Sequence, residues 1–398
     1  MTTGARTGDA IRRVVPAFLT YGFRPFFLAA GLWSAVALTM WIVMLEAGAT
    51  LPSRFDPLAW HVHEMLFGFV MAAIAGFLLT AIPNWTGRLP VSGGPLALLA
   101  ALWSLGRIAS LISATLPPWL AVTADLSFPV VLVGVVAREI IAGRNWRNLP
   151  MVAAIIVLGI ANLLMHLEAY DIDVPPGLGW RLGLAAVIVL VSVVAGRVIP
   201  SFTRNWLAKR QSSNLPAAYG WIDRIALGAL QVGLILWTFS PQFRPIGLLL
   251  LLAAAINLYR LLLWRGAATI AEPLLLALHV GYAWLVFGIA LLGLSTLGVD
   301  LPPSVAIHAL TAGAIGTMIL AMMTRATRGH VGRELSADRI TSLIYVLVTL
   351  AAITRVAAAL ATVWTMPLLV VSACFWIAAF GGFVVAYGPM LLLPRRER

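Results

Sequence analysis

The sequence predicts an all-α, polytopic membrane protein with about twelve transmembrane helices. Of its 398 residues, 61% are hydrophobic and only 11% are charged, and the mean hydropathy is +0.96. In a soluble globular chain roughly a quarter of the residues are charged, so this chain has too few charged residues to cover a water-exposed surface. Runs of 18 or more mostly apolar residues recur along it, each close to the roughly 20 residues that a helix needs to cross a bilayer. The alternating ten-residue segments of a membrane barrel are absent, and helices satisfy their own backbone groups.

The first element is a basic segment, residues 1–25, which we expect in the cytoplasm. Arg6, Arg12 and Arg13 precede an apolar stretch at 26–47. That stretch is longer than the roughly 7–15 residues of a signal-peptide core, and no small-residue cleavage site follows it. We therefore expect an uncleaved first transmembrane helix.

The spans that follow are separated by turn-forming residues. Proline pairs interrupt the apolar pattern at Pro117-Pro118, Pro175-Pro176 and Pro302-Pro303. The expected spans are 26–47, 58–82, 95–115, 119–142, 149–168, 178–200, 221–240, 245–264, 272–297, 303–324, 340–361 and 367–392. They form one predicted transmembrane domain over 26–392, followed by a basic cytoplasmic tail at 393–398.

Basic residues gather in alternate loops, which predicts the topology. With the N-terminus in the cytoplasm, the opposite loops carry little basic charge beyond Arg54 and Arg244, and the longest of them holds Glu168, Asp171 and Asp173. The positive-inside rule then places both termini in the cytoplasm. The net charge of +12 is scattered over the loops and forms no basic face, so the sequence argues against nucleic-acid binding.

Polar residues inside the spans recur at a regular spacing. Arg107, Gln231 and Arg355, in the third, seventh and eleventh spans, lie at equal spacings of 124 residues. His61 and His308 open the second and tenth spans, and they are 247 residues apart, nearly two such periods. The pattern predicts three repeats of four helices.

The histidines are the candidate ligands of a cofactor. His61, His63 and His308 stand at the outer ends of the second and tenth spans, and His166 at the outer end of the fifth. His279 lies about two turns into the ninth span from the cytoplasmic side. Ionisable groups at membrane depth are costly and therefore indicate function. Neutral imidazole is the usual ligand of haem iron and copper, so we expect these five to bind a cofactor, with the first three as metal ligands.

The sharpest local pattern is Trp60-His61-Val62-His63-Glu64. On a helix, His61 and His63 point about 200° apart, which makes them unsuited to holding one metal together. His61 and Glu64, three residues apart, share a face. Glu64 could then orient a ligand or relay a proton, and His63 would look toward a second centre. The alternative is that these residues occupy the headgroup zone, where Trp and His are common. His330, in a basic loop, is expected to be solvated.

Arg107, Arg355 and Asp125 are charges that lie inside predicted spans. The two arginines could pair with haem propionates, which suit a guanidinium fork. They could instead bond Asp125 or helix-end carbonyls and hold the bundle together. We favour the structural interpretation.

Motifs along nearly the whole chain resemble the NnrS family. The WHVHE and TRATRGH stretches are its most specific features. The matching segments are residues 23–27, 60–68, 76–87, 308–318 and 324–330. The resemblance implies a bacterial inner-membrane protein that contains haem and copper and protects cells against nitric oxide and nitrosative stress, often beside denitrification.

The leading hypothesis is a haem b protein, with copper as a further cofactor, that binds or reduces nitric oxide near the periplasmic face. Reduction would need electrons from quinol or a soluble carrier. By analogy, the catalytic subunits of haem–copper oxidases also carry haem ligands on the second and tenth of twelve helices. Two rivals stay open. One is a transporter of a metal, haem or small anion that uses Arg107 and Arg355, although transporter halves usually repeat twice. The other is a haem sensor without turnover.

Overall fold

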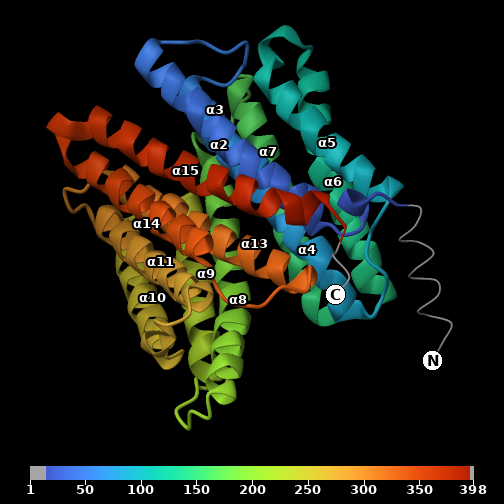
Figure 1. The fold of residues 1–398 in the computed structure, drawn as a ribbon. Coiled ribbons are helices and arrows are strands. Elements are labelled where there is room, and N and C mark those ends of the chain that lie inside the picture. Colours follow the sequence, from blue (N-terminus) through green and yellow to red (C-terminus); the bar gives the residue numbers. More distant parts are fainter. Residues whose placement is uncertain (1–14, 395–398) are drawn as a thin grey trace. The chain divides into compact units, whose positions relative to one another are not determined.

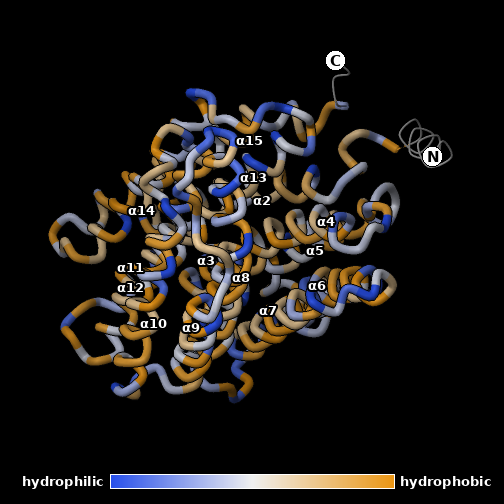
Figure 2. Tube along the Cα trace, turned by 90° about the horizontal axis from the view of Figure 1, so that it is seen from below, coloured by the Kyte–Doolittle hydropathy of each residue, from blue (hydrophilic) through white to orange (hydrophobic). Residues whose placement is uncertain are grey.

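The structure is a computed structural model that describes residues 15–394, and every regular element in that range is a helix (Figure 1). Twelve of these helices are long and apolar enough to cross a membrane, which confirms the predicted all-α polytopic architecture. The predicted basic residues Arg6, Arg12 and Arg13, and those of the tail from Arg395, lie outside the described residues. Hydrophobic residues dominate the traces of α5, α6 and α7 in Figure 2.

The helices form two compact units, and each is described by itself. Within the described residues, the first unit comprises 15–183, 326–334 and 383–394, and the second comprises 184–325 and 335–382. The predicted domain boundaries at 26 and 392 and the threefold repeat stay predictions.

The first unit is built around its second span. Its helices are α2 (Phe23–Ala47), α3 (Pro57–His63), the π-helical η2 (Glu64–Val70), α4 (Met71–Thr86), α5 (Gly94–Leu111), α6 (Pro118–Ala142) and α7 (Leu149–Ala169), with short 3-10 turns at Ala17–Leu19, Ser113–Thr115 and Trp146–Asn148. The continuous span α3–η2–α4 is the most enclosed of the twelve, with 83% of its most apolar window buried. Helix α6 packs against both α5 and α7, and α2 packs on α4.

The second unit also contains a π-helical segment within one of its spans. Its helices are α9 (Trp221–Phe239), α10 (Arg244–Leu263), α11 (Pro273–Leu297), α12 (Pro303–His308), the π-helical η6 (Ala309–Gly316) and α14 (Arg339–Leu360), with 3-10 turns at Gly266–Thr269 and Thr362–Trp364. Three helices contribute to both units: α8 (Leu178–Lys209), α13 (Thr317–His330) and α15 (Thr365–Leu392). Helix α11 packs against α10 and η6.

Two helices run further than hydropathy predicts. Helix α8 continues from the expected end at residue 200 to Lys209, and α13 from 324 to His330. The apolar run ends where charged residues begin, yet a helix satisfies its backbone equally well in water. His330 is therefore the exposed last residue of a helix rather than a loop residue, and its ring stacks on Phe23 at 5.4 Å.

Candidate metal centre

The second span carries two adjacent polar residues into the interior of the first unit. Asp56 caps α3 by accepting hydrogen bonds from the backbone N–H groups of the next turn. His63 is the last residue of α3, and Glu64 is the first of the π-helical segment η2. Single π-helical turns inside α-helices occur frequently at functional sites, because the extra residue per turn re-aims the side chains around it. Both side chains are fully buried.

Three neighbouring helices add the remaining polar groups of the cluster. Arg107 comes from α5 and Asp125 from α6, and each is at most 5% exposed. Asn162 and His166 both come from α7, and because they are four residues apart they share one face of that helix. All of these side chains are buried.

Two imidazoles converge on one carboxylate oxygen. Asp125 Oδ2 lies 3.1 Å from Nε2 of His63 and 3.0 Å from Nε2 of His166. It also accepts a hydrogen bond of 2.9 Å from the amide of Asn162, whose oxygen lies 2.8 Å from Nε2 of His63. One ligand atom from each of His63, Asp125 and His166 falls within 4.8 Å of the others, close enough for the three residues, called the triad below, to hold one metal ion.

The second oxygen of Asp125 and the carboxylate of Glu64 are held by one guanidinium. Arg107 donates from Nη2 to Asp125 Oδ1 and from Nη1 to Glu64 Oε2 at 2.7 Å. Trp33 donates its indole N–H to the same Glu64 oxygen at 2.8 Å. The other Glu64 oxygen lies 3.0 Å from Nδ1 of His63. Glu64 therefore fixes the orientation of His63 and leaves Nε2 facing Asp125.

The net charge of the cluster favours a cation. Two carboxylates, Glu64 and Asp125, face one guanidinium, Arg107, so neutral imidazoles leave one formal negative charge among buried groups. Both ring nitrogens of His63 face oxygen atoms, which only a proton or a metal ion can bridge. Nδ1 of His166 is buried and has no hydrogen-bond partner among residues 15–394.

Two buried phenyl rings pack against the imidazoles of the cluster. Phe55, in the loop before α3, stacks on the His63 ring at 4.5 Å and lies 5.0 Å from the His166 ring. Phe67, in η2, lies 5.3 Å from the His63 ring. Both are buried. Since charges interact more strongly where water is excluded, these rings strengthen every ion pair of the cluster.

Gly106 allows α5 and α6 to approach at the cluster. A Cβ atom at this position would lie 2.7 Å from Asp125 Oδ1 and 3.2 Å from Asp125 Cα. Gly106→Ala should therefore lower the free energy of unfolding by about 1–3 kcal/mol, because the two helices must separate. Thermal unfolding in detergent measures the change. The matched control is Gly134→Ala in α6, where a Cβ meets nothing within 4 Å. Equal shifts for the two variants would contradict this account of Gly106.

His61 lies outside the triad. Its ring stacks on Trp41 at 4.8 Å, with the planes 14° apart. The sequence pairs Glu64 with His61, three residues earlier, but the structure pairs it with His63. The π-helical turn that begins at Glu64 turns its side chain away from the ideal 100° spacing, and spacing rules for an α-helix do not anticipate that.

Three further predicted residues belong to the second unit. His308 precedes η6 and holds its Nδ1 2.7 Å from the Ser304 carbonyl oxygen. Arg355 lies half-buried on α14. His279, on α11, accepts from or donates to the Thr203 hydroxyl at 3.0 Å.

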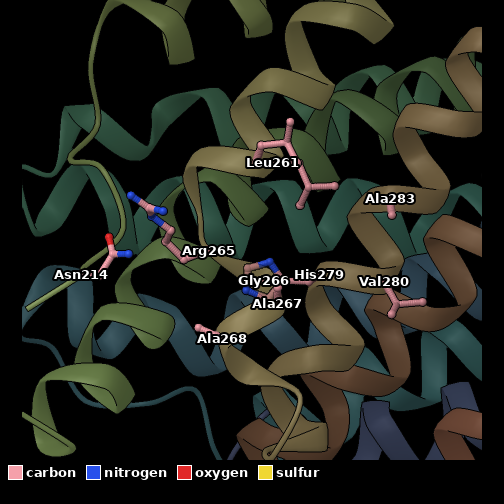
Figure 3. Close-up of a pocket in the computed structure, with 10 residues that line it drawn as sticks. Asn214, Leu261, Arg265, Gly266, Ala267, Ala268, His279, Val280 and Ala283 are labelled. Atoms are coloured by element: carbon pink, nitrogen blue, oxygen red, sulfur yellow. The ribbon is translucent and has the colours of Figure 1, made fainter. Parts of the chain in front are cut away.

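His279 also lines the cavity in Figure 3. The cavity has a volume of about 530 Å³, and its walls are mostly apolar, with Asn214 and Arg265 as the other polar side chains. The His279 ring lies beside Gly266 in the close-up, and its Nδ1 is buried without a partner.

Two members of the cluster were not among the predicted ligands. Asp125 is recognisable in the sequence as a carboxylate inside a span, but it was expected to pair with arginine rather than to face two histidines. Asn162 gives a weaker signal, because a neutral amide barely changes the hydropathy of a span. Its spacing of four from His166 is the feature that could have found it.

Comparison with known proteins identifies the chain's relatives at the family level. The model of the family described as NnrS protein matches residues 17–395, nearly the whole chain. A search of curated proteins found no match.

Proposed function

Because the chain belongs to the NnrS family, we propose that it is a membrane protein of the nitric oxide response that holds a copper or iron ion at His63, Asp125 and His166. The observation that carries the proposal is the convergence of Nε2 of both histidines on one buried carboxylate oxygen, at 3.1 and 3.0 Å. An ion held there would be the place where nitric oxide binds.

The donor set suits such an ion. Two ligand atoms at about 2.0–2.2 Å from one ion would stand about 3 Å or more apart. The two histidine–aspartate distances, 3.1 and 3.0 Å, are compatible with that. Two imidazoles with one carboxylate suit iron, and imidazole suits copper equally. Glu64 supplies the carboxylate that orients a metal-binding histidine through its other nitrogen. An ion bound here would supply an open coordination position for nitric oxide and one-electron chemistry.

A haem iron does not fit this cluster. Two oxygens, from Asn162 and Asp125, lie within 3.1 Å of Nε2 of His63. They occupy the space that a porphyrin bonded at that nitrogen needs. The haem b of the leading hypothesis would therefore bind elsewhere, and His61, His279 and His308 stay candidate ligands.

The cluster favours metal binding over anion transport. Both terminal nitrogens of Arg107 are engaged by carboxylates, so this arginine presents no unpaired fork to a transported anion. Its role is to hold the two carboxylates in place, which supports the structural interpretation of Arg107 and opposes transport of an anion at this arginine. Consumption of nitric oxide with a supplied reductant separates a reductase from a sensor.

The experiment that tests the proposal is metal quantification on the purified protein, with the histidines replaced singly. Besides any haem iron, which is counted separately from the visible spectrum, the wild type should carry about one copper or non-haem iron ion per chain. His166→Ala should reduce the metal content at least tenfold. Loss of a residue that only supports a ligand already lowers metal affinity by about 10–100-fold, and loss of the ligand itself should cost at least as much. The matched control is His330→Ala, which removes an exposed histidine and should leave the content unchanged.

A second variant guards against misfolding. Asp125→Asn keeps the side-chain volume and should also lose the metal while the protein elutes as a single species from a sizing column. A wild type free of both metals, or His166→Ala with its full metal content, would overturn the proposed site.

A further inference from the structure

The loop before α3 covers the candidate metal centre with a single side chain. In this loop, Arg54 and Asp56 are exposed, whereas Phe55 between them is only 5% exposed. The Phe55 ring contacts the rings of both His63 and His166. Phe55 therefore packs against both histidines of the triad, next to exposed residues of the loop.

The loop is fastened to the neighbouring elements by the two residues that precede Phe55. The Ser53 hydroxyl donates to the Ser110 carbonyl oxygen at 2.9 Å, and the backbone N–H of Arg54 donates to the Ser113 hydroxyl at 2.8 Å. Arg54 also pairs with Asp171, after α7, at 3.0 Å. That ion pair is exposed and hence weak, so the fastening rests on the hydrogen bonds to Ser110 and Ser113, which are buried.

We infer that Phe55 is the residue that selects what reaches the triad. Its phenyl ring excludes water and charged solutes from the histidines, because any polar molecule entering here must displace an apolar ring and leave its own hydration behind. A small uncharged diatomic molecule carries little hydration and passes by a modest movement of the ring. This selection rests on the proposed function, since it assigns the uncharged gas as the ligand.

The sequence context distinguishes Phe55 from the other ring at the cluster. Phe67 also contacts His63, but it lies within η2, and its neighbours Leu66 and Gly68 are buried. Removing Phe67 therefore creates an enclosed cavity, whereas removing Phe55 opens the triad to the exterior. The two phenylalanines form a matched pair, because both rings contact His63 and each substitution by alanine removes the same phenyl ring.

The test is chemical labelling of the histidines, which needs no bound metal. Purified wild type, Phe55→Ala and Phe67→Ala are treated with diethylpyrocarbonate, a water-soluble reagent for neutral imidazole, and modification at each histidine is followed by mass spectrometry. In Phe55→Ala, His166 should be labelled at least tenfold faster than in the wild type, because its Nδ1 has no partner. In Phe67→Ala the rate should stay within about twofold. His330, which is exposed, provides the internal standard.

Phe55→Leu keeps an apolar cover and should restore slow labelling, which separates coverage from a general loss of folding. Equal rates in Phe55→Ala and the wild type, or equally fast labelling in both alanine variants, would overturn the inference. Metal content is measured on the same samples. A metal-free wild type with fast labelling only in Phe55→Ala would therefore refute the metal site and leave the access role of Phe55 intact.

Discussion

Replacing Arg107 with methionine should lower the free energy of unfolding by about 3–5 kcal/mol, the cost of breaking a buried ion pair by removing one partner. Arg107 is the shared partner of Glu64 and Asp125, and both carboxylates are at most 1% exposed. Without the guanidinium, two negative charges would face each other in a place from which water is excluded. Methionine fills most of the volume, so the effect reports the lost charge rather than a cavity.

Titration with sodium dodecyl sulphate, followed by tryptophan fluorescence, measures this change. Arg138→Met is the matched control. Arg138 pairs with Glu139 at 2.6 Å, but its side chain is 65% exposed, so its loss should cost about 1 kcal/mol or less. The double variant Glu64→Gln with Arg107→Met should regain part of the loss, because one unpaired charge is gone. A loss for Arg107→Met no larger than that of the control would show that the arginine does not hold the cluster.

The number of helices could be predicted from sequence because the bilayer imposes a length on each apolar run. All twelve predicted spans coincide with observed membrane-length helices. The ends of the helices were harder to predict from the sequence. Charges that begin near residue 200 mark the end of the hydrocarbon zone, whereas α8 itself continues to Lys209.

The residue types of the cluster could be predicted in part from the sequence. Ionisable residues inside spans stand out by their cost in lipid, which is why His63, Glu64, Arg107 and His166 were singled out. The partners of these residues could not be predicted from the sequence, because the rotation of each helix about its axis is set by packing against its neighbours. That rotation decides that Asp125 faces two histidines.

The π-helical segments show what periodicity alone misses. The sequence matches His61 with His308 as the residues that open the second and tenth spans. In the structure, η2 begins directly after His63 and η6 directly after His308. By that criterion His63, not His61, corresponds to His308 in its own unit. A π-helical turn has no composition of its own, so hydropathy could not reveal it.

The second unit contains a buried pair whose removal should cost as much as that of Arg107. Arg260, on α10, is 1% exposed and donates from Nε to Asp223 Oδ1 at 2.8 Å. Its Nη1 donates to the Tyr282 hydroxyl at 2.8 Å and lies 3.3 Å from the Ser192 hydroxyl. Arg260→Met should therefore lower the free energy of unfolding by about 3–5 kcal/mol, because Asp223 loses its counter-charge in a buried position.

Two comparisons test this reasoning. Arg54→Met breaks an ion pair of 3.0 Å whose side chains are 47% and 87% exposed, and it should cost about 1 kcal/mol or less. Asp223→Asn combined with Arg260→Met should recover part of the loss, since no unpaired charge then stays buried. Metal content should be unchanged in Arg260→Met, because none of its partners belongs to the triad. A double variant less stable than Arg260→Met alone would show that the lost hydrogen bonds, rather than the unpaired charge, dominate the energy of this pair.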